Sequence, residues 1–236
     1  MKKRIVLIAV CVLLCACSVS AVRGSGKRIT ESRQVRGFDR VSLTGSGEVM
    51  LTQGDGESLT VETDENVMPY VIAEVDGGTL TLGTKSGVSI STTRLVFTLS
   101  VQDLDGMAVT GSGNINVERF DTDRLEIEVT GSGNVRIDAL AAQAAQVRIT
   151  GSGNVDLAGQ VTGQEVTLGG SGQYRGGDLR SETASVTVSG SGDATLWATG
   201  SLDARVTGSG SVRYYGDPQT NVSGSGSGTV KRLGDK

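Results

Sequence analysis

The sequence contains no histidine and only two prolines, and its three cysteines all lie within the first 17 residues. The chain beyond Cys17 therefore has no thiol for a disulfide and neither of the side chains that usually bind zinc. It also lacks the imidazole base of Ser-His-Asp and Cys-His catalytic groups, so its many serines have no candidate activating partner. We expect no catalytic residues, no metal site and no cofactor.

The sequence also lacks a large excess of charge of either sign, since the net charge is −4 and acidic and basic residues are interspersed. No basic stripe is present, which argues against nucleic acid as a partner. Aromatic residues make up 3% of the chain and glycine is abundant, a composition that could indicate disorder. The regular placement of Val, Ile and Leu predicts a folded domain instead.

The first 16 residues have the features of an export signal, with a basic start at residues 2–4 and an apolar run over residues 5–16. The run ends in Leu-Cys-Ala-Cys at residues 14–17, which resembles the bacterial lipobox. Cleavage before Cys17 leaves a small residue at the cut, whereas cleavage before Cys15 would leave the bulky Leu14 there. The alternative is an ordinary signal peptide that happens to contain cysteines.

Lipidation of Cys17 with diacylglycerol and an amide-linked chain such as palmitate would anchor the protein firmly, because two signals are needed for stable membrane attachment. Residues 17–32 are then expected to form a flexible tether. The first expected partner of the protein is therefore the membrane, through the lipid on Cys17. The expected location is the bacterial cell envelope, either at the outer membrane and periplasm or at the cell surface.

A Gly-Ser-Gly motif recurs through the second half of the chain with a period near 20 residues. The first glycines of the copies are Gly111, Gly131, Gly151, Gly170, Gly190, Gly208 and Gly224. An eighth copy occupies residues 45–47. A sustained period of this length is typical of a solenoid.

Apolar residues alternate with polar ones on both sides of each motif, which predicts strands that meet at a glycine corner. Two residues before the corners stand Val109, Val129, Ile149, Leu168, Val188, Val206 and Val222, and two residues after them stand Ile115, Val135, Val155, Tyr174, Ala194 and Val212. Phe120, Leu140 and Leu179 suggest a looser third side. The pattern predicts an all-β fold, a β-solenoid resembling a parallel β-helix with coils of about 20 residues.

Residues 107–236 are expected to form this solenoid, and residues 33–106 an irregular N-terminal lobe or cap that contains the first Gly-Ser-Gly coil. Within the lobe, Asp-Gly-Gly at residues 76–78 indicates a hairpin, and residues 64–70 suggest a short helical turn. Asn114, Asn134 and Asn154 follow successive corners and are expected to form a hydrogen-bonded ladder from coil to coil.

Trp197 and Tyr215 are the candidate ligand-binding residues. The alternation points Tyr214 inward and places Trp197 and Tyr215 in one outward column, where they could stack on a sugar or simply pack at an edge. Asp138, Asp156 and Arg136 could lie near one another, as a sugar-cleaving site would require. An exposed charge ladder is the favoured interpretation of those three residues.

The chain resembles the bacterial head GIN domain family, the "putative auto-transporter adhesins", from about residue 33 to residue 233. The resemblance rests on Val-Arg-Gly-Phe-Asp-Arg-Val at residues 35–41, on residues 61–70 and on the later Gly-Ser-Gly-Asn repeats. It implies a β-helical fold on exported and often lipidated proteins. It supplies no catalytic residues to carry over. The last residues, 230–236, contain no membrane strand or wall-sorting signal, so we expect retention to depend on Cys17.

The predicted function is that of a non-catalytic envelope lipoprotein whose rigid module binds a glycan or an envelope protein in adhesion. One alternative is a structural solenoid that polymerises end to end, in which case the chain would form oligomers. A second and less favoured alternative is a carbohydrate-active β-helix enzyme.

Overall fold

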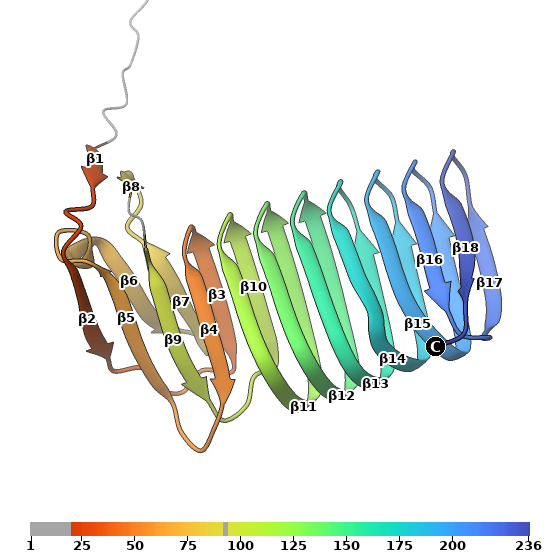
Figure 1. The fold of residues 1–236 in the computed structure, drawn as a ribbon, viewed down its shortest axis with the longest axis horizontal. Coiled ribbons are helices and arrows are strands. Elements are labelled where there is room, and N and C mark those ends of the chain that lie inside the picture. The colour runs from red at the N-terminus through yellow and green to blue at the C-terminus, as the bar shows by residue number, and fades with distance from the viewer. Residues whose placement is uncertain (1–19, 92–93) are drawn as a thin grey trace, which may run out of the picture.

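The computed structural model describes residues 20–91 and 94–236, and these residues form a β-solenoid of about six turns, as predicted (Figure 1). The strands are, in chain order, β1 Ser20–Arg23, β2 Arg28–Arg33, β3 Arg40–Gly45, β4 Glu48–Gln53, β5 Ser58–Asp64, β6 Val71–Asp76, β7 Thr79–Thr84, β8 Val88–Ser91, β9 Val96–Val101, β10 Gly106–Gly111, β11 Asn114–Gly131, β12 Asn134–Gly151, β13 Asn154–Leu168, β14 Gln173–Val188, β15 Asp193–Val206, β16 Ser211–Tyr215, β17 Gln219–Gly224 and β18 Thr229–Gly234. A short 3₁₀ helix, η1 Met68–Tyr70, precedes β6.

The coils stack in parallel and in register, so residues one period apart face each other. In the pairing of β11 with β12, Ile115 lies opposite Val135 and Val129 lies opposite Ile149. All four side chains are fully buried, and the inner residues of the third side, such as Phe120, are buried as well. The alternation in the sequence therefore identified the core correctly as far as Val212, because each of these inward rows is enclosed by both faces of the solenoid and by the neighbouring coils.

The glycine corners are required by the close approach of one coil to the next. Gly131 and Gly151 have φ angles of 119° and 129°, a region that only glycine adopts readily. At Gly153, which has an ordinary φ, an added Cβ would overlap the carbonyl oxygen of Gly133 on the preceding coil. The sequence predicted the conformational reason for glycine, and the structure adds a steric reason that applies along the whole stack.

The asparagine ladder is present beside the corners. Asn134 donates a 2.7 Å hydrogen bond from Nδ2 to Oδ1 of Asn114, and Asn154 donates an equivalent 2.7 Å bond to Asn134. The amide of Asn134 thus accepts from Asn154 and donates to Asn114, which fixes the register of three successive coils.

The N-terminal lobe departs from the parallel repeat. β6 and β7 form the predicted hairpin, with Gly77 and Gly78 at positive φ, and η1 lies in the segment expected to form a helical turn. β5 pairs antiparallel with both β9 and β2, so the parallel stacking ends there.

The segment expected to be a tether, residues 17–32, contributes two strands within its described part. β1 pairs with β8 and β2 pairs with β5, and Ile29 packs against the core. Pairing with β2 satisfies backbone groups that would otherwise be exposed at the edge of β5. The glycines at residues 24 and 26 led to the prediction of a flexible segment, but the alternating residues of β2 begin two residues after Gly26.

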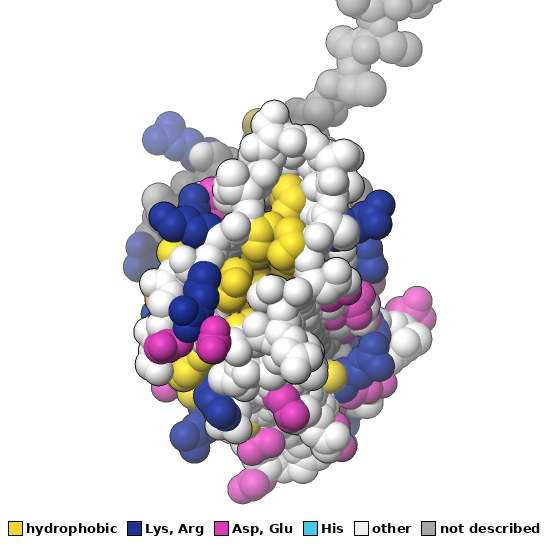
Figure 2. Space-filling model, turned by 90° about the vertical axis from the view of Figure 1, so that its right-hand side faces the viewer, with side chains coloured by type: hydrophobic (Ala, Val, Ile, Leu, Met, Phe, Trp, Pro, Cys, Tyr) yellow, Lys and Arg dark blue, Asp and Glu magenta, His cyan; other side chains and the backbone are white. Residues whose placement is uncertain are grey.

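The C-terminal end of the stack is open. The sequence prediction of the last corner was wrong by two residues, because Gly226 rather than Gly224 stacks on Gly208. Val222 therefore continues the column of Val186 and Ala204 rather than that of Val206, and it is 54% exposed where they are 1% and 0% exposed. Val206, Val222, Val230 and the glycines of the last corner line a hollow at this end. Figure 2 shows apolar side chains at this end, framed by backbone and polar groups. No later coil within residues 94–236 covers this face, and Lys231 is exposed on the edge strand β18.

Candidate functional site

Trp197 and Tyr215 lie next to each other on adjacent coils, as the alternation predicted. Trp197 of β15 pairs in register with Tyr215 of β16, and both side chains are half-buried on the outer face. The Tyr214 side chain, which was expected to point inward, packs against the core. Cys17, the predicted lipidation site, and the predicted signal peptide of residues 1–16 lie outside the described residues.

A bulge in β14 completes the surroundings of the two rings. Gly176 pairs with Leu196 and Arg180 pairs with Trp197, so residues 177–179 have no partner in β15. Leu179 is fully buried and holds the bulge in the core, which leaves Asp178 directed to solvent. Bulges redirect side chains in this way where a strand gains extra residues.

The bulge lies directly against the Tyr215 ring. A Cβ built on Gly177 would be 3.3 Å from Cε2 of Tyr215, so the absence of a side chain at Gly177 makes room for the ring. In the same way, a Cβ on Gly216 would be 3.4 Å from Cδ1 of Trp197. We call Gly177, Asp178, Trp197 and Tyr215 the aromatic site.

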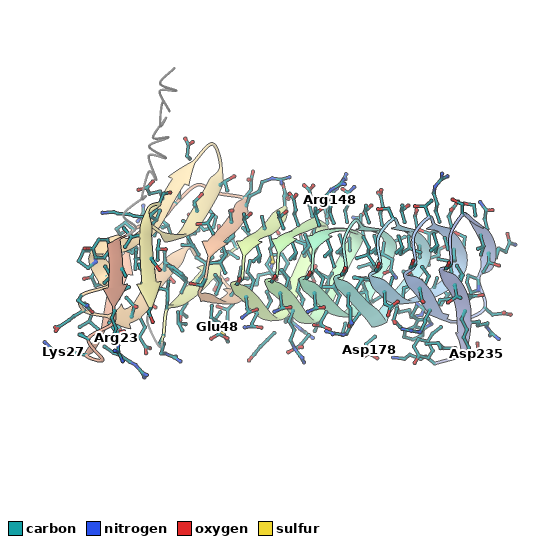
Figure 3. The ribbon with its side chains drawn as sticks, turned by 90° about the horizontal axis from the view of Figure 1, so that it is seen from above. Arg23, Lys27, Glu48, Arg148, Asp178 and Asp235 are labelled. Atoms are coloured by element: carbon teal, nitrogen blue, oxygen red, sulfur yellow. The ribbon has the colours of Figure 1, made fainter. Side chains whose placement is uncertain are left out.

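Lys236 covers part of the aromatic site. Its Nζ lies 4.9 Å from the centroid of the Tyr215 ring and forms an ion pair with Asp178. Arg232 holds the same segment in place, since its Nε donates a 2.6 Å hydrogen bond to the carbonyl oxygen of Gly216 and its Nη2 contacts Asp235 at 2.6 Å. Figure 3 shows Asp178 and Asp235 on the same side of the rod, opposite Arg148.

A buried polar network fixes the backbone of Trp197 from inside. The Tyr174 hydroxyl donates a 2.7 Å hydrogen bond to Oε1 of Gln164, whose Nε2 donates to Oγ of Ser181 at 2.8 Å. Ser181 Oγ in turn donates a 2.8 Å hydrogen bond to the carbonyl oxygen of Trp197. Gln164, Ser181 and Tyr174 are all buried, so each hydrogen bond replaces water that these groups have lost.

Burial raises the pKa of the Tyr174 phenol above its ordinary value, because the interior disfavours the phenolate. The hydroxyl therefore remains protonated in the physiological range and acts as a permanent donor to Gln164. The sequence placed Tyr174 inward but gave no sign of its hydrogen-bond partner.

The acidic residues considered for catalysis are paired with arginines. Arg136 Nε lies 2.7 Å from Oδ1 of Asp138, and Arg175 Nη1 lies 3.1 Å from Oδ1 of Asp156. Arg136 and Asp156 face each other on neighbouring coils, so these charges form a ladder along the outer face. Within residues 20–91 and 94–236, no three acidic, histidine or cysteine side chains gather into a group able to hold a metal ion.

Sequence reasoning missed Asp178 and Lys236 as neighbours of the aromatic residues. One signal was available, because the spacing of the motifs falls from 20 residues after Gly170 to 18 residues after Gly190. Two adjacent coils of unequal length must form a bulge somewhere, but the spacing does not say where.

Comparison with known proteins identifies the fold and the family. A family model described as "Putative auto-transporter adhesin, head GIN domain" matches residues 37–218. A crystal structure of a "putative adhesin" from Bacteroides fragilis is 29% identical with a TM-score of 0.85, covering 90% of this chain and 100% of that one. No match was found among curated protein sequences.

Two structures from Parabacteroides distasonis are also similar. One is described as a "putative lipid binding protein", is 26% identical and has a TM-score of 0.76, and the other is described as a "putative adhesin", is 25% identical and has a TM-score of 0.74. Both matches cover 91% of this chain and 100% of the other. No helix in the described ranges is long and apolar enough to span a membrane.

The substitution Tyr174→Phe tests the buried network. It removes the donor to Gln164 Oε1 and leaves that buried oxygen unsatisfied, which should lower the free energy of unfolding by about 1–3 kcal/mol. Tyr214→Phe, which alters a half-buried tyrosine outside the network, should stay within about 0.5 kcal/mol of the parent protein. Urea denaturation measures both, and equal stabilities of the two variants would contradict the role given to the network.

Proposed function

Because this chain belongs to the family described as "Putative auto-transporter adhesin, head GIN domain", we propose that it is a non-catalytic lipoprotein of the bacterial cell envelope. In this proposal Cys17 carries the lipid anchor, and the solenoid presents the aromatic site to a glycan on another surface. The protein would act in adhesion or binding, at the cell surface or in the periplasm.

The observation that carries the binding function is the placement of Trp197 and Tyr215 side by side on rigid strands. Tyr and Trp offer a large apolar face together with a polar group, and their side chains lose little conformational entropy on binding. The network behind Trp197 and the bulge beside Tyr215 hold the two residues in place before a ligand arrives. Preorganisation of this kind lowers the cost of binding.

The proposed anchor is supported by the leader sequence and by the short distance from Cys17 to the folded module. The residues before Cys17 have the lipobox pattern, and β1 begins at Ser20, three residues later. An acyl group on Cys17 would therefore hold the N-terminal lobe close to the membrane, and the C-terminal coils lie at the opposite end of the rod from this lobe (Figure 1).

Substitution of Cys17 tests the anchor. Cys17→Ala should abolish incorporation of labelled palmitate and move the protein from the membrane fraction to the soluble fraction, because the acylated side chain is gone. Cys15→Ala, which leaves Cys17 available, should retain both the label and the membrane fraction. Incorporation that persists in Cys17→Ala would overturn the proposed anchor.

Substitution of the aromatic residues tests the binding surface. Trp197→Ala and Tyr215→Ala should each weaken the strongest interaction found on a glycan array roughly tenfold or more, and the double variant should show none. Met50→Ala is the matched control, since Met50 is 40% exposed on the outer face of β4, which lies between β11 and β9 and is separated from β15 by several coils. Unchanged binding in the double variant would place the ligand elsewhere.

The open C-terminal end favours a second candidate function, end-to-end association of the rods. Val222 is exposed at the end of a column that is otherwise buried, and within the part of the chain that the structure describes β17 and β18 each pair with one strand only. Unpaired edge strands and uncovered apolar surface are the features through which β-proteins associate.

A concentration series by light scattering tests this association. If the open end is the interface, the apparent mass should grow with concentration, and Val222→Asp should remove that growth by placing a charge at the entrance. Val75→Asp is the control, because Val75 is 37% exposed on β6 at the opposite end. A constant mass in the parent protein, or growth that survives Val222→Asp, would rule out this second function.

A further inference from the structure

We infer that the aromatic site recognises a glycan that carries free amino groups, such as a glucosamine polymer. The inference rests on the proposed glycan-binding function of Trp197 and Tyr215, and it names the chemical class of the ligand. Its basis is that the site already holds a primary ammonium group, which the chain itself supplies.

Lys236 acts as a stand-in for such a ligand. Its ammonium group lies over the Tyr215 ring, 4.9 Å from the centroid, and forms an ion pair with Asp178. The lysine side chain is 29% exposed although it lies at the molecular surface, so its alkyl part is largely covered. Alkylammonium groups are recognised by the face of an aromatic ring and by a carboxylate, and here both contact the same ammonium group.

The β14 bulge, rather than Lys236, sets the positions of Asp178 and Tyr215 in the aromatic site. Leu179 anchors the bulge in the core, Gly177 leaves space for the Tyr215 ring, and Asp178 between these two residues in the chain is directed to solvent. Because the bulge fixes the backbone at Asp178, its carboxylate would stay within reach of a cation on the Tyr215 ring after Lys236 has been displaced.

The neighbouring charges leave Lys236 as the exchangeable partner of Asp178. Arg232 contacts Asp217 at 3.5 Å and Asp235 at 2.6 Å, so both of these carboxylates are already engaged by a guanidinium. Arg232 also binds the Gly216 carbonyl oxygen, and so it can hold the segment while the Lys236 side chain moves away.

Exchange of one ammonium for another favours a cationic sugar over a neutral one. A neutral sugar that stacks on Tyr215 must displace the Lys236 ammonium and offers Asp178 no cation in return. An amino sugar restores both the ion pair and the cation–π contact while its ring faces the aromatic side chains.

A sugar fits the site better than the lysine side chain of a partner protein. A lysine would reproduce the contacts of Lys236 with Asp178 and Tyr215 and would leave Trp197 without a role. A ring with an amino substituent also uses the Trp197 face, which lies in the same outward column one coil away.

The test uses Trp197 as a probe, because it is the only tryptophan in the sequence. The full-length protein in detergent is titrated with a β-1,4-linked glucosamine tetramer, with the corresponding N-acetylglucosamine tetramer and with tetralysine, and tryptophan fluorescence is recorded. We expect the glucosamine tetramer to bind roughly tenfold more tightly than the acetylated one. Asp178→Asn should remove this difference, and Lys236→Ala should tighten the binding of both sugars severalfold.

Asp138→Asn is the matched control for charge, because Asp138 is an exposed carboxylate on β12, two coils before the bulge of β14. It should leave all affinities unchanged. Equal affinities for the two sugars, a difference that survives Asp178→Asn, or tightest binding by tetralysine would each overturn the inference.

The two proposals fail in different ways. If the acetylated tetramer binds as tightly as the glucosamine tetramer and Tyr215→Ala, which keeps the Trp197 probe, weakens both, the glycan-binding function stands and the amino-sugar inference falls. If neither sugar changes the fluorescence and no glycan binds on an array, the proposed function itself falls.

Discussion

Neighbouring coils are held at the spacing of hydrogen-bonded strands, about 4.8 Å, and at the Gly-Ser-Gly corners this spacing leaves no volume for a side chain. The amides of Ser152 and Gly153 both bond to the carbonyl oxygen of Gly131, at 2.7 Å and 3.1 Å, so the chain turns while in contact with the coil below it. The stacked β-branched rows and the asparagine ladder depend on this contact, because both require exact superposition of successive coils.

Superposition also restricts where a binding function can be placed. Where a coil matches its neighbour, the outward side chains form regular columns that pair with one another from coil to coil. The alternating charges of Arg136, Asp156 and Arg175 are an example. A surface that differs from the repeat arises where two neighbouring coils differ in length. In this chain the largest mismatch is the three-residue bulge of β14, and it carries Asp178 to the two aromatic residues that face outward.

Much of the fold could be predicted because it repeats. The sequence shows the 20-residue period, the inward rows, the glycine corners and the asparagine ladder several times each, so each copy supports the prediction made from the others. The outward positions of Trp197 and Tyr215 follow from the same alternation. The contact of Lys236 with Asp178 joins residues 58 positions apart through a single irregularity, and no repeat reports it. The antiparallel pairing of β2 with β5 was hidden for the same reason, since it lies outside the periodic region.

Hydrogen exchange along the coils tests the central claim, which is that each coil is stable only through its neighbours. The backbone amides of β12, β13 and β14, which have a coil on both sides, should exchange most slowly, and those of β17 should exchange fastest among the strands of the repeat. Equal protection of β17 and β13 in the monomeric protein would contradict the account, because it would mean that a coil keeps its structure without a neighbour to cover it.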